Sequence, residues 1–126
     1  ARRDIRCPIV ILIDENSASA SEIFAGAMKA YGLATLVGEQ SYGKASVQTL
    51  VPFADGASAK ITIAKYYLPD GKDISRKQDE DGQRISGGLK PDVEAKQSFH
   101  PDTQVGDPAT DAQLQEAIRV IRAKKF

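Results

Sequence analysis

PIVILIDENSASASEIFAGAMKAYGLATLVG, residues 8–38, holds the order of elements from which the rest of the fold follows. Pro8 to Ile13 is a run of β-branched residues and leucine, typical of a strand buried on both faces of a parallel sheet. From Ala20 to Tyr31 the residues at helical spacing are apolar, and Gly32 follows as a C-cap. Residues 33–38 predict a second strand. Strand, helix and strand in this order favour a right-handed parallel βαβ crossover and an α/β fold.

The face expected to pack in this helix is made of apolar side chains three and four residues apart: Ile23, Phe24, Ala27, Met28, Ala30 and Tyr31. Downstream the pattern becomes antiparallel. Val47–Phe53 and Ala59–Leu68 read as strands, and an Asp-Gly turn between them predicts a hairpin. Residues 69–88 are rich in charge and glycine, which predicts a solvated loop.

A C-terminal helix is predicted from its start signal and its periodicity. Asp107 followed by Pro108 is typical of an N-cap with proline at the first helical position. The apolar stripe that follows consists of Leu114, Ala117, Ile118 and Ile121.

Composition excludes several classes of partner. The chain has 126 residues, enough for one domain, and its 17 basic and 17 acidic side chains cancel. No field of one sign would therefore attract nucleic acid or an anionic membrane. Its apolar runs are shorter than the roughly 20 residues of a membrane span, so stable membrane insertion is not expected. Cys7 is the single cysteine, which rules out an internal disulfide and favours simple packing at the entry to the first strand.

Ser19 stands between the first strand and the first helix, where backbone N–H groups lack partners. The helix N-terminus also carries the positive end of the macrodipole, and both features suit a nucleophile that generates an oxyanion. A structural alternative remains open, because Ser19-Ala20-Ser21-Glu22 also fits a capping box.

A base for such a serine is available in Lys44, which lies between small residues. Buried and kept neutral, its amine would form a serine–lysine dyad that needs no histidine. The alternatives are a solvated surface amine for Lys44 and an exposed strand residue for Gln48. Metal chemistry is disfavoured, since His100 is the single histidine and has no cysteine or carboxylate at ligand spacing. No cofactor is expected.

Two blocks together resemble one family. Ser17–Glu22 reads Ser-Ala-Ser-Ala-Ser-Glu, and Ser41–Gln48 reads Ser-Tyr-Gly-Lys-Ala-Ser-Val-Gln. The chain resembles the C-terminal processing peptidases, or tail-specific proteases, whose hallmark is the first block followed by Gly-Lys-Gly-x-x-Gln. The only departure is Ala45 in place of a second glycine. The resemblance covers about residues 7–95 and, more weakly, residues 114–121.

The resemblance implies a role for each matching residue: Ser19 as nucleophile, Lys44 as general base, Gln48 as the residue that orients the lysine, and the backbone N–H of Ala20 as an oxyanion donor. A lysine has an unperturbed pKa of about 10.4, and lowering it by three units costs about 4 kcal/mol. Burial away from carboxylates would have to supply this. For Lys44 and Gln48 to touch, the segment must turn, because four extended residues span roughly 13 Å and one helical turn about 6 Å.

The implied fold is a ClpP/crotonase-like protease core, of which residues 1–126 form one partial domain. The PDZ domain and the upstream core strands of the family are expected to lie outside this sequence, together with the second oxyanion donor. Exposed strand edges are then expected where those strands would pair.

The implied activity is that of a serine endopeptidase that cleaves proteins at or near their C-termini through an acyl-enzyme. Its substrates would be polypeptides with apolar C-terminal tails, and the family context allows a homo-oligomer and points to the bacterial envelope or periplasm. An alternative is a non-catalytic module of the same fold that binds peptides or apolar ligands. A thioester-processing enzyme of this fold ranks lower, because it would use backbone donors and no serine–lysine pair.

Overall fold

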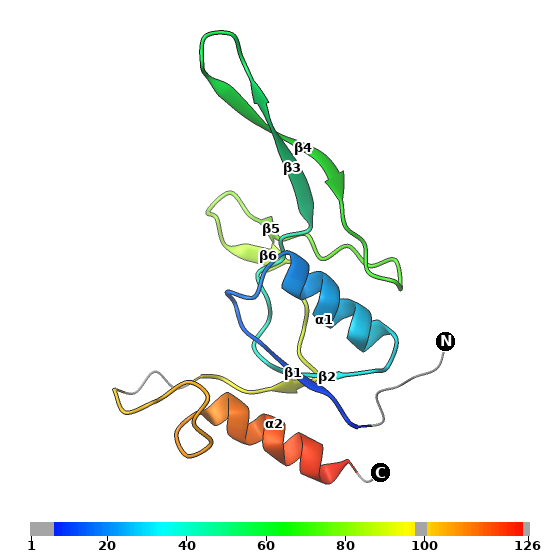
Figure 1. Cartoon of the computed structure of the whole chain (residues 1–126), viewed down its shortest axis with the longest axis vertical. Helices are drawn as coiled ribbons and strands as arrows, with labels where there is room; N and C mark the ends of the chain where they lie inside the picture. The colour runs from blue at the N-terminus through cyan, green and yellow to red at the C-terminus, as the bar shows by residue number, and fades with distance from the viewer. Residues whose placement is uncertain (1–6, 98–100, 125–126) are drawn as a thin grey trace.

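A small parallel sheet between two helices forms the base of the molecule. The computed structural model describes residues 7–97 and 101–124. Strands β1 (Val10–Ile13), β2 (Thr35–Gly38) and β7 (Val93–Glu94) pair in parallel in the order β1-β2-β7. Helix α1 (Ala20–Ala30) lies on one face and α2 (Ala112–Ala123) on the other (Figure 1). The predicted α/β class and the parallel strand–helix–strand order are confirmed.

Helix α1 buries a glutamate and two small residues, not the predicted apolar stripe. Its buried positions are Glu22, Ala25 and Gly26, whereas Phe24 and Tyr31 are 60% and 64% exposed. A methyl group at Gly26 would overlap the side chain of Leu68, so the close approach of this helix requires a small residue. The stripe prediction was wrong because helical spacing identifies apolar residues but not which face meets the sheet.

The predicted end of α1 is confirmed. Gly32 has φ +64° and donates to the carbonyl of Lys29, while Leu33 donates to that of Met28. This pair of bonds is a Schellman motif, which favours glycine at its left-handed position.

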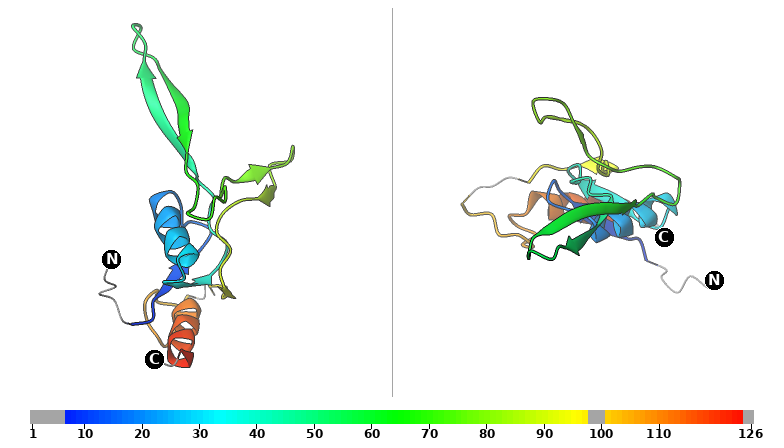
Figure 2. Two further views of the ribbon diagram at one scale, coloured as in Figure 1. Left: turned by 90° about the vertical axis from the view of Figure 1, so that its right-hand side faces the viewer. Right: turned by 90° about the horizontal axis from the view of Figure 1, so that it is seen from above.

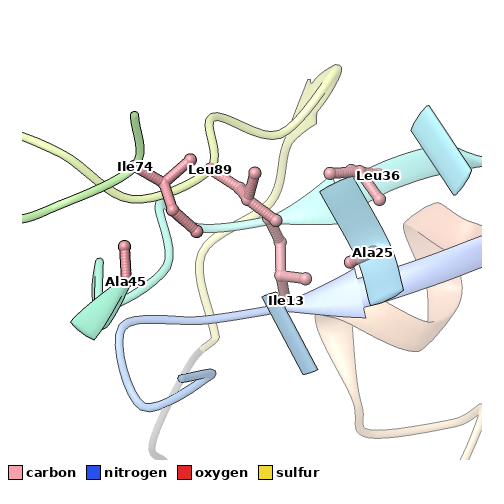
Figure 3. Packing of buried hydrophobic residues seen from close by; sticks show 6 residues of the cluster. All are labelled: Ile13, Ala25, Leu36, Ala45, Ile74 and Leu89. Carbon is pink, nitrogen blue, oxygen red and sulfur yellow. The ribbon is translucent and has the colours of Figure 1, made fainter. Parts of the chain in front are cut away.

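The hydrophobic core is small and lies between α1 and the sheet (Figure 3). Its buried members are Ile13, Ala25, Leu36, Ala45, Ile74 and Leu89. Strand β1 is not buried on both faces as predicted, because it is an edge strand and Leu12 is 40% exposed.

Residues 69–88 are not simply a solvated loop. Ile74 belongs to the core, and β5 (Lys77–Gln78) pairs with β6 (Arg84–Ser86) in a second, short hairpin. The sequence did not predict either feature, because the segment is rich in charge. The hairpin is exposed on most of its surface, and of residues 69–88 Ile74 alone belongs to the core.

The predicted long hairpin is confirmed as an arm that projects from the rest of the molecule (Figures 1 and 2). We call β3 (Ser46–Pro52) and β4 (Ser58–Lys65) the β3–β4 arm; the two strands are antiparallel and pair with each other. Strand β4 ends at Lys65, three residues before the predicted end. Apolar side chains on the arm face solvent, including Leu50 at 66% and Ile63 at 63% exposure. Neither strand of the arm has a second partner strand among the described residues.

Helix α2 begins four residues later than the Asp-Pro signal indicated. Its N-cap is Asp111, whose carboxylate accepts a hydrogen bond from the backbone N–H of Leu114 at 2.9 Å. Asp107 instead closes a turn, accepting from the N–H of Ala109 at 2.9 Å. Within the predicted stripe, Ala117 is buried while Ile121 is 38% exposed.

Three further points concern isolated features. Cys7 is exposed, which contradicts the expected packing. His100 lies outside the described residues. In the part of the chain that the structure describes, neither helix has the length and apolarity needed to cross a bilayer.

Candidate active site

Ser19 occupies a strained turn between the loop after β1 and the start of α1. Its backbone has φ 59° and ψ −121°, and it is the one non-glycine residue with positive φ among the described residues. Such a conformation costs of order 1–3 kcal/mol and tends to occur at functional sites. A strained strand-to-helix turn is also how α/β-hydrolases expose a serine nucleophile. Ala20 follows as the first helical residue, where backbone N–H groups have no intrahelical acceptor.

The loop that leads into Ser19 is fixed by Asp14. Its Oδ1 accepts from the backbone N–H and the hydroxyl of Ser17, both at 2.8 Å, and from the N–H of Asn16 at 3.1 Å. Burial raises the pKa of Asp14, but these hydrogen bonds outweigh it and hold the pKa below its ordinary value. The carboxylate therefore orders the turn in its charged form.

The carboxylate of Glu22 connects α1 to the segment that carries Lys44. Glu22 is 1% exposed. Its Oε1 accepts from the hydroxyl of Ser41 at 2.5 Å and from the N–H of Gly43 at 2.6 Å, and its Oε2 accepts from the N–H groups of Lys44 at 2.8 Å and Ser19 at 2.9 Å. Two bonds at each oxygen match the acceptor capacity of a carboxylate. We call Ser19, Glu22, Ser41, Gly43 and Lys44 the Glu22 cluster.

The most consequential feature of the Glu22 cluster is the shared oxygen. The backbone nitrogens of Ser19 and Lys44 both donate to Oε2, so they lie no farther apart than the two hydrogen bonds together allow. Two residues 25 positions apart in the sequence are thus held side by side by one buried side chain. The two blocks that the sequence singled out meet in space.

Further hydrogen bonds hold the Lys44 segment from the opposite side. The hydroxyl of Ser41, itself fully buried, accepts from the N–H of Leu89 at 2.7 Å. The N–H of Tyr42 donates to the carbonyl of Ser17 at 2.9 Å. The segment is therefore anchored to the nucleophile loop on one flank and to the strand-β7 connection on the other.

The side chain of Lys44 is exposed in this chain, not buried as expected. Gln48 is exposed as well, and its amide donates to the hydroxyl of Thr62 across the arm at 3.3 Å. The segment does not make the turn that a Lys44–Gln48 contact requires. It runs into β3, whose only irregularity is a register shift between Val47 and Gln48.

A cleft nevertheless brings these side chains to one place. It has a volume of about 600 Å³. Its walls include Lys44 and Gln48 together with Ala18, the residue before the candidate nucleophile, and the remaining lining residues are Asn16, Tyr42, Gly43, Ser46, Arg76 and Gln78. A peptide in this cleft would pass beside the Ser19 turn.

The capping-box alternative for Ser19 is compatible with a catalytic role. Glu22 accepts from the N–H of Ser19, as a capping box requires, and the same carboxylate binds Lys44. Sequence reasoning recognised Glu22 only as a capping residue and gave Ser41 no role. The signal that could have found Glu22 and Ser41 is the acidic residue in the helix turn after the serine. Once buried, such a carboxylate needs hydrogen-bond donors from other segments.

The described residues contain no group of three or more histidine, cysteine or carboxylate side chains that could hold a metal ion. Besides the carboxylates of Asp14 and Glu22 and the guanidinium of Arg76, the described part of the site offers a hydroxyl, an amine, amides and backbone donors. These are the groups used in acyl transfer by serine–lysine pairs.

Comparison with known protein families gives an independent result. The family model described as peptidase family S41 matches residues 2–95. A carboxy-terminal-processing protease of Bartonella bacilliformis is 43% identical over 90 residues, 71% of this chain and 18% of that protein. The carboxyl-terminal-processing protease of Synechocystis is 37% identical over 114 residues, 90% of this chain and 24% of that protein. The carboxy-terminal processing protease CtpB of Bacillus subtilis is 38% identical over 113 residues, 90% of this chain and 20% of that protein.

Solved structures give the same fold. The photosystem II D1 C-terminal processing protease matches 93% of this chain and 25% of its own with a TM-score of 0.60 and 32% identity. The tricorn protease matches 92% of this chain with a TM-score of 0.56 at 22% identity, a likeness of fold alone. The predicted protease-core fold is confirmed. The chain spans between 18% and 25% of the length of these C-terminal processing relatives.

Proposed function

Because the chain belongs to peptidase family S41, we propose that the protein that contains it is a serine endopeptidase acting at or near the C-termini of protein substrates. Ser19 is the nucleophile and Lys44 the general base in this proposal. Relatives that carry the name of C-terminal processing proteases support the activity. The shared hydrogen bonds of Ser19 and Lys44 to Glu22 support the choice of residues.

The proposed reaction has two halves. Ser19 Oγ attacks the scissile carbonyl as its proton passes to Lys44 Nζ, and the oxyanion is met by the N–H of Ala20. Lys44 then returns the proton to the leaving amine, and the acyl-enzyme forms. In the second half a water molecule gives its proton to Lys44 and attacks the ester, and Ser19 regains its hydrogen as the acid product leaves.

The single observation that carries this proposal is the backbone conformation of Ser19. A capping serine needs no positive φ, whereas this one has φ 59° at the head of a helix. The strain is held in place by Glu22, which binds the N–H of Ser19 directly. A strained, buttressed serine beside a lysine is the arrangement that nucleophilic catalysis uses.

The exposed side chain of Lys44 indicates that further segments of the longer protein must cover the site. A general base that works through a neutral amine requires a drier setting than Lys44 has in this chain. We propose that segments of the longer protein cover the cleft, bring Gln48 to the amine and provide a second oxyanion donor. The C-terminal processing relatives are four to five times longer than the matched region, so such segments are available in them.

Site-directed variants of the full-length protein test the assignment. Ser19→Ala should abolish hydrolysis of an unfolded polypeptide with an apolar tail. Ser21→Ala is the matched control, because that hydroxyl is two residues away, exposed, and donates to the carbonyl of Ala18. A fluorophosphonate probe should label Ser19. Proteolysis that survives Ser19→Ala, or a label on Ser17 or Ser21, would reassign the nucleophile.

The role of Lys44 has its own test. Lys44→Arg keeps a positive charge but cannot serve as a base at neutral pH, so it should be inactive. Hydrolysis retained by Lys44→Arg in the full-length protein would contradict a lysine base.

The exposed Lys44 also favours the second candidate, a module that binds peptides without cleaving them. Saturable binding of the apolar-tailed polypeptide by the full-length protein, without hydrolysis, would select this module. Location in the bacterial envelope or periplasm, apolar tails and a homo-oligomer remain predictions. Cell fractionation would test the location, substrates with altered C-terminal tails would test the apolar preference, and light scattering would test the oligomeric state.

A further inference from the structure

Arg76 stands at the wall of the candidate cleft with unused hydrogen-bonding capacity. Among the described residues, its Nε is one of two buried side-chain polar atoms without a hydrogen-bond partner. Most buried polar groups in native proteins are paired, so Arg76 is a guanidinium whose donors the described residues do not fully satisfy. Arg76 lines the same cleft as Lys44 and Gln48.

The position of Arg76 is fixed on its backbone side. Its N–H donates to the carbonyl of Gly43 at 2.8 Å, next to Lys44 in the chain. The hairpin that Arg76 opens is tied to the same segment by Arg84, whose Nη2 donates to the carbonyls of Ser41 at 2.7 Å and Tyr42 at 2.5 Å. These bonds hold Arg76 at a defined place relative to the Glu22 cluster.

The guanidinium of Arg76 also contacts an aromatic ring of the cleft wall. Its Cζ lies 5.3 Å from the centroid of the Tyr42 ring, a cation–π distance. A guanidinium carries five N–H donors and can bind a carboxylate with two parallel hydrogen bonds.

The charges of the cleft favour an anion. Of its lining residues Lys44 and Arg76 carry positive charge, and none carries a carboxylate. We propose that this cleft is a substrate subsite in which Arg76 binds a carboxylate of the peptide beside the Ser19 turn. The inference rests on the proposed peptidase function and names a substrate feature for it. The carboxylate is either the free C-terminus or an Asp or Glu side chain close to the scissile bond.

Peptide sets distinguish the two sources in the full-length protein. One peptide has a free C-terminus and no acidic residue, a second is its C-terminal amide, and further amides carry a single Asp on each side of the cleavage site. The unaltered enzyme should prefer one class of acid over the plain amide by about 10- to 100-fold in kcat/KM, the range of a charge-assisted bond. Arg76→Gln should remove that preference, so that acid and amide peptides are cleaved with similar kcat/KM.

Lys77→Gln is the matched control, since it removes the neighbouring positive charge, which is exposed and does not line the cleft. It should keep the preference. Arg76→Lys should keep only part of it, because an ammonium lacks the planar fork. Equal losses for acid and amide peptides in Arg76→Gln, or no preference in the unaltered enzyme, overturn the proposal.

A binding measurement separates this inference from the proposed catalysis. The Ser19→Ala variant should bind the preferred acid peptide about 10- to 100-fold more tightly than the amide by fluorescence anisotropy, and the double variant with Arg76→Gln should not. If the protein proves to bind without cleaving, this binding preference still tests the subsite. Equal binding of acid and amide by Ser19→Ala refutes the subsite even if Ser19 is the nucleophile.

Discussion

The Glu22 cluster and the β3–β4 arm carry the candidate catalytic residues but differ in how firmly they are held. In the cluster, one buried carboxylate accepts four hydrogen bonds and joins residues from two distant segments. The arm is two strands that pair with each other and expose most of their side chains. The accessible surface of the chain, 8967 Å², exceeds the roughly 6,600 Å² typical of a compact protein of this mass.

This difference separates the parts of the site that the chain positions by itself from those that it does not. The backbones of Ser19 and Lys44 are fixed by their hydrogen bonds to Glu22, within this chain. Gln48, on the arm, is turned toward Thr62. The backbone positions of the proposed nucleophile and base are therefore set by contacts to Glu22, whereas Gln48, the proposed orienting residue, is held only within the arm.

The largest expected effect comes from breaking the cluster with Glu22→Gln. The amide keeps the shape but turns an NH2 group toward N–H donors, which leaves buried donors unpaired. Stability should fall by about 3 kcal/mol or more, and kcat of the full-length enzyme should fall with it. Urea unfolding and steady-state kinetics measure the two. Glu15→Gln, at an exposed position of the preceding loop, should change neither.

A comparison of apolar truncations should give the next largest effect. Leu36→Ala removes a fully buried core side chain and should cost about 2–5 kcal/mol. Ile63→Ala, on the arm and 63% exposed, should stay within about 0.5 kcal/mol in this chain. Equal losses in thermal unfolding would mean that the arm is packed in solution.

Two glycines with similar φ angles test the difference between the Glu22 cluster and the β3–β4 arm. Gly43, in the cluster, has φ +93°, and a Cβ there would lie 2.8 Å from Gly88 N and 2.9 Å from Ile74 O. Gly56, at the tip of the arm, has φ +87° and open space around it. Gly43→Ala should therefore cost about 2–3 kcal/mol and Gly56→Ala about 1 kcal/mol. Denaturant titration measures the two losses of stability. A loss for Gly43→Ala no larger than that for Gly56→Ala would mean that the cluster relaxes around the added methyl group.

The smallest expected effect is a pH dependence from Asp14. Its pKa is held below the ordinary 3.8, so the folded state binds its proton less readily than the unfolded state does. Its contribution to stability is therefore present above pH 3.8 and lost as the pH falls through the lowered value. We expect stability to fall on acidification through this range, and this fall to be absent in Asp14→Asn. Unfolding curves from pH 5 to pH 2 that coincide for the two proteins would contradict this.

Local pattern predicted the elements more reliably than it predicted their faces. The βαβ order and the long hairpin were both readable, since each depends on periodicity and turn chemistry within a short window. The buried face of α1 was not, because Gly26 lies against Leu68 and Leu89, and Ala25 belongs to a core built from distant segments. The start of α2 was also misjudged, because Asp107 and Asp111 are both good caps and the surrounding fold chose the second.

The sequence by itself determined the family, the strand–helix–strand order and the two blocks that contain Ser19 and Lys44, because these are encoded in residues close together along the chain. Only the tertiary structure decided that Glu22 joins the blocks, that Ile74 completes the core and that Lys44, Gln48 and Arg76 share a cleft. The physical reason is that burial and hydrogen-bond pairing between distant segments depend on how close the backbones come, and no local pattern specifies that distance.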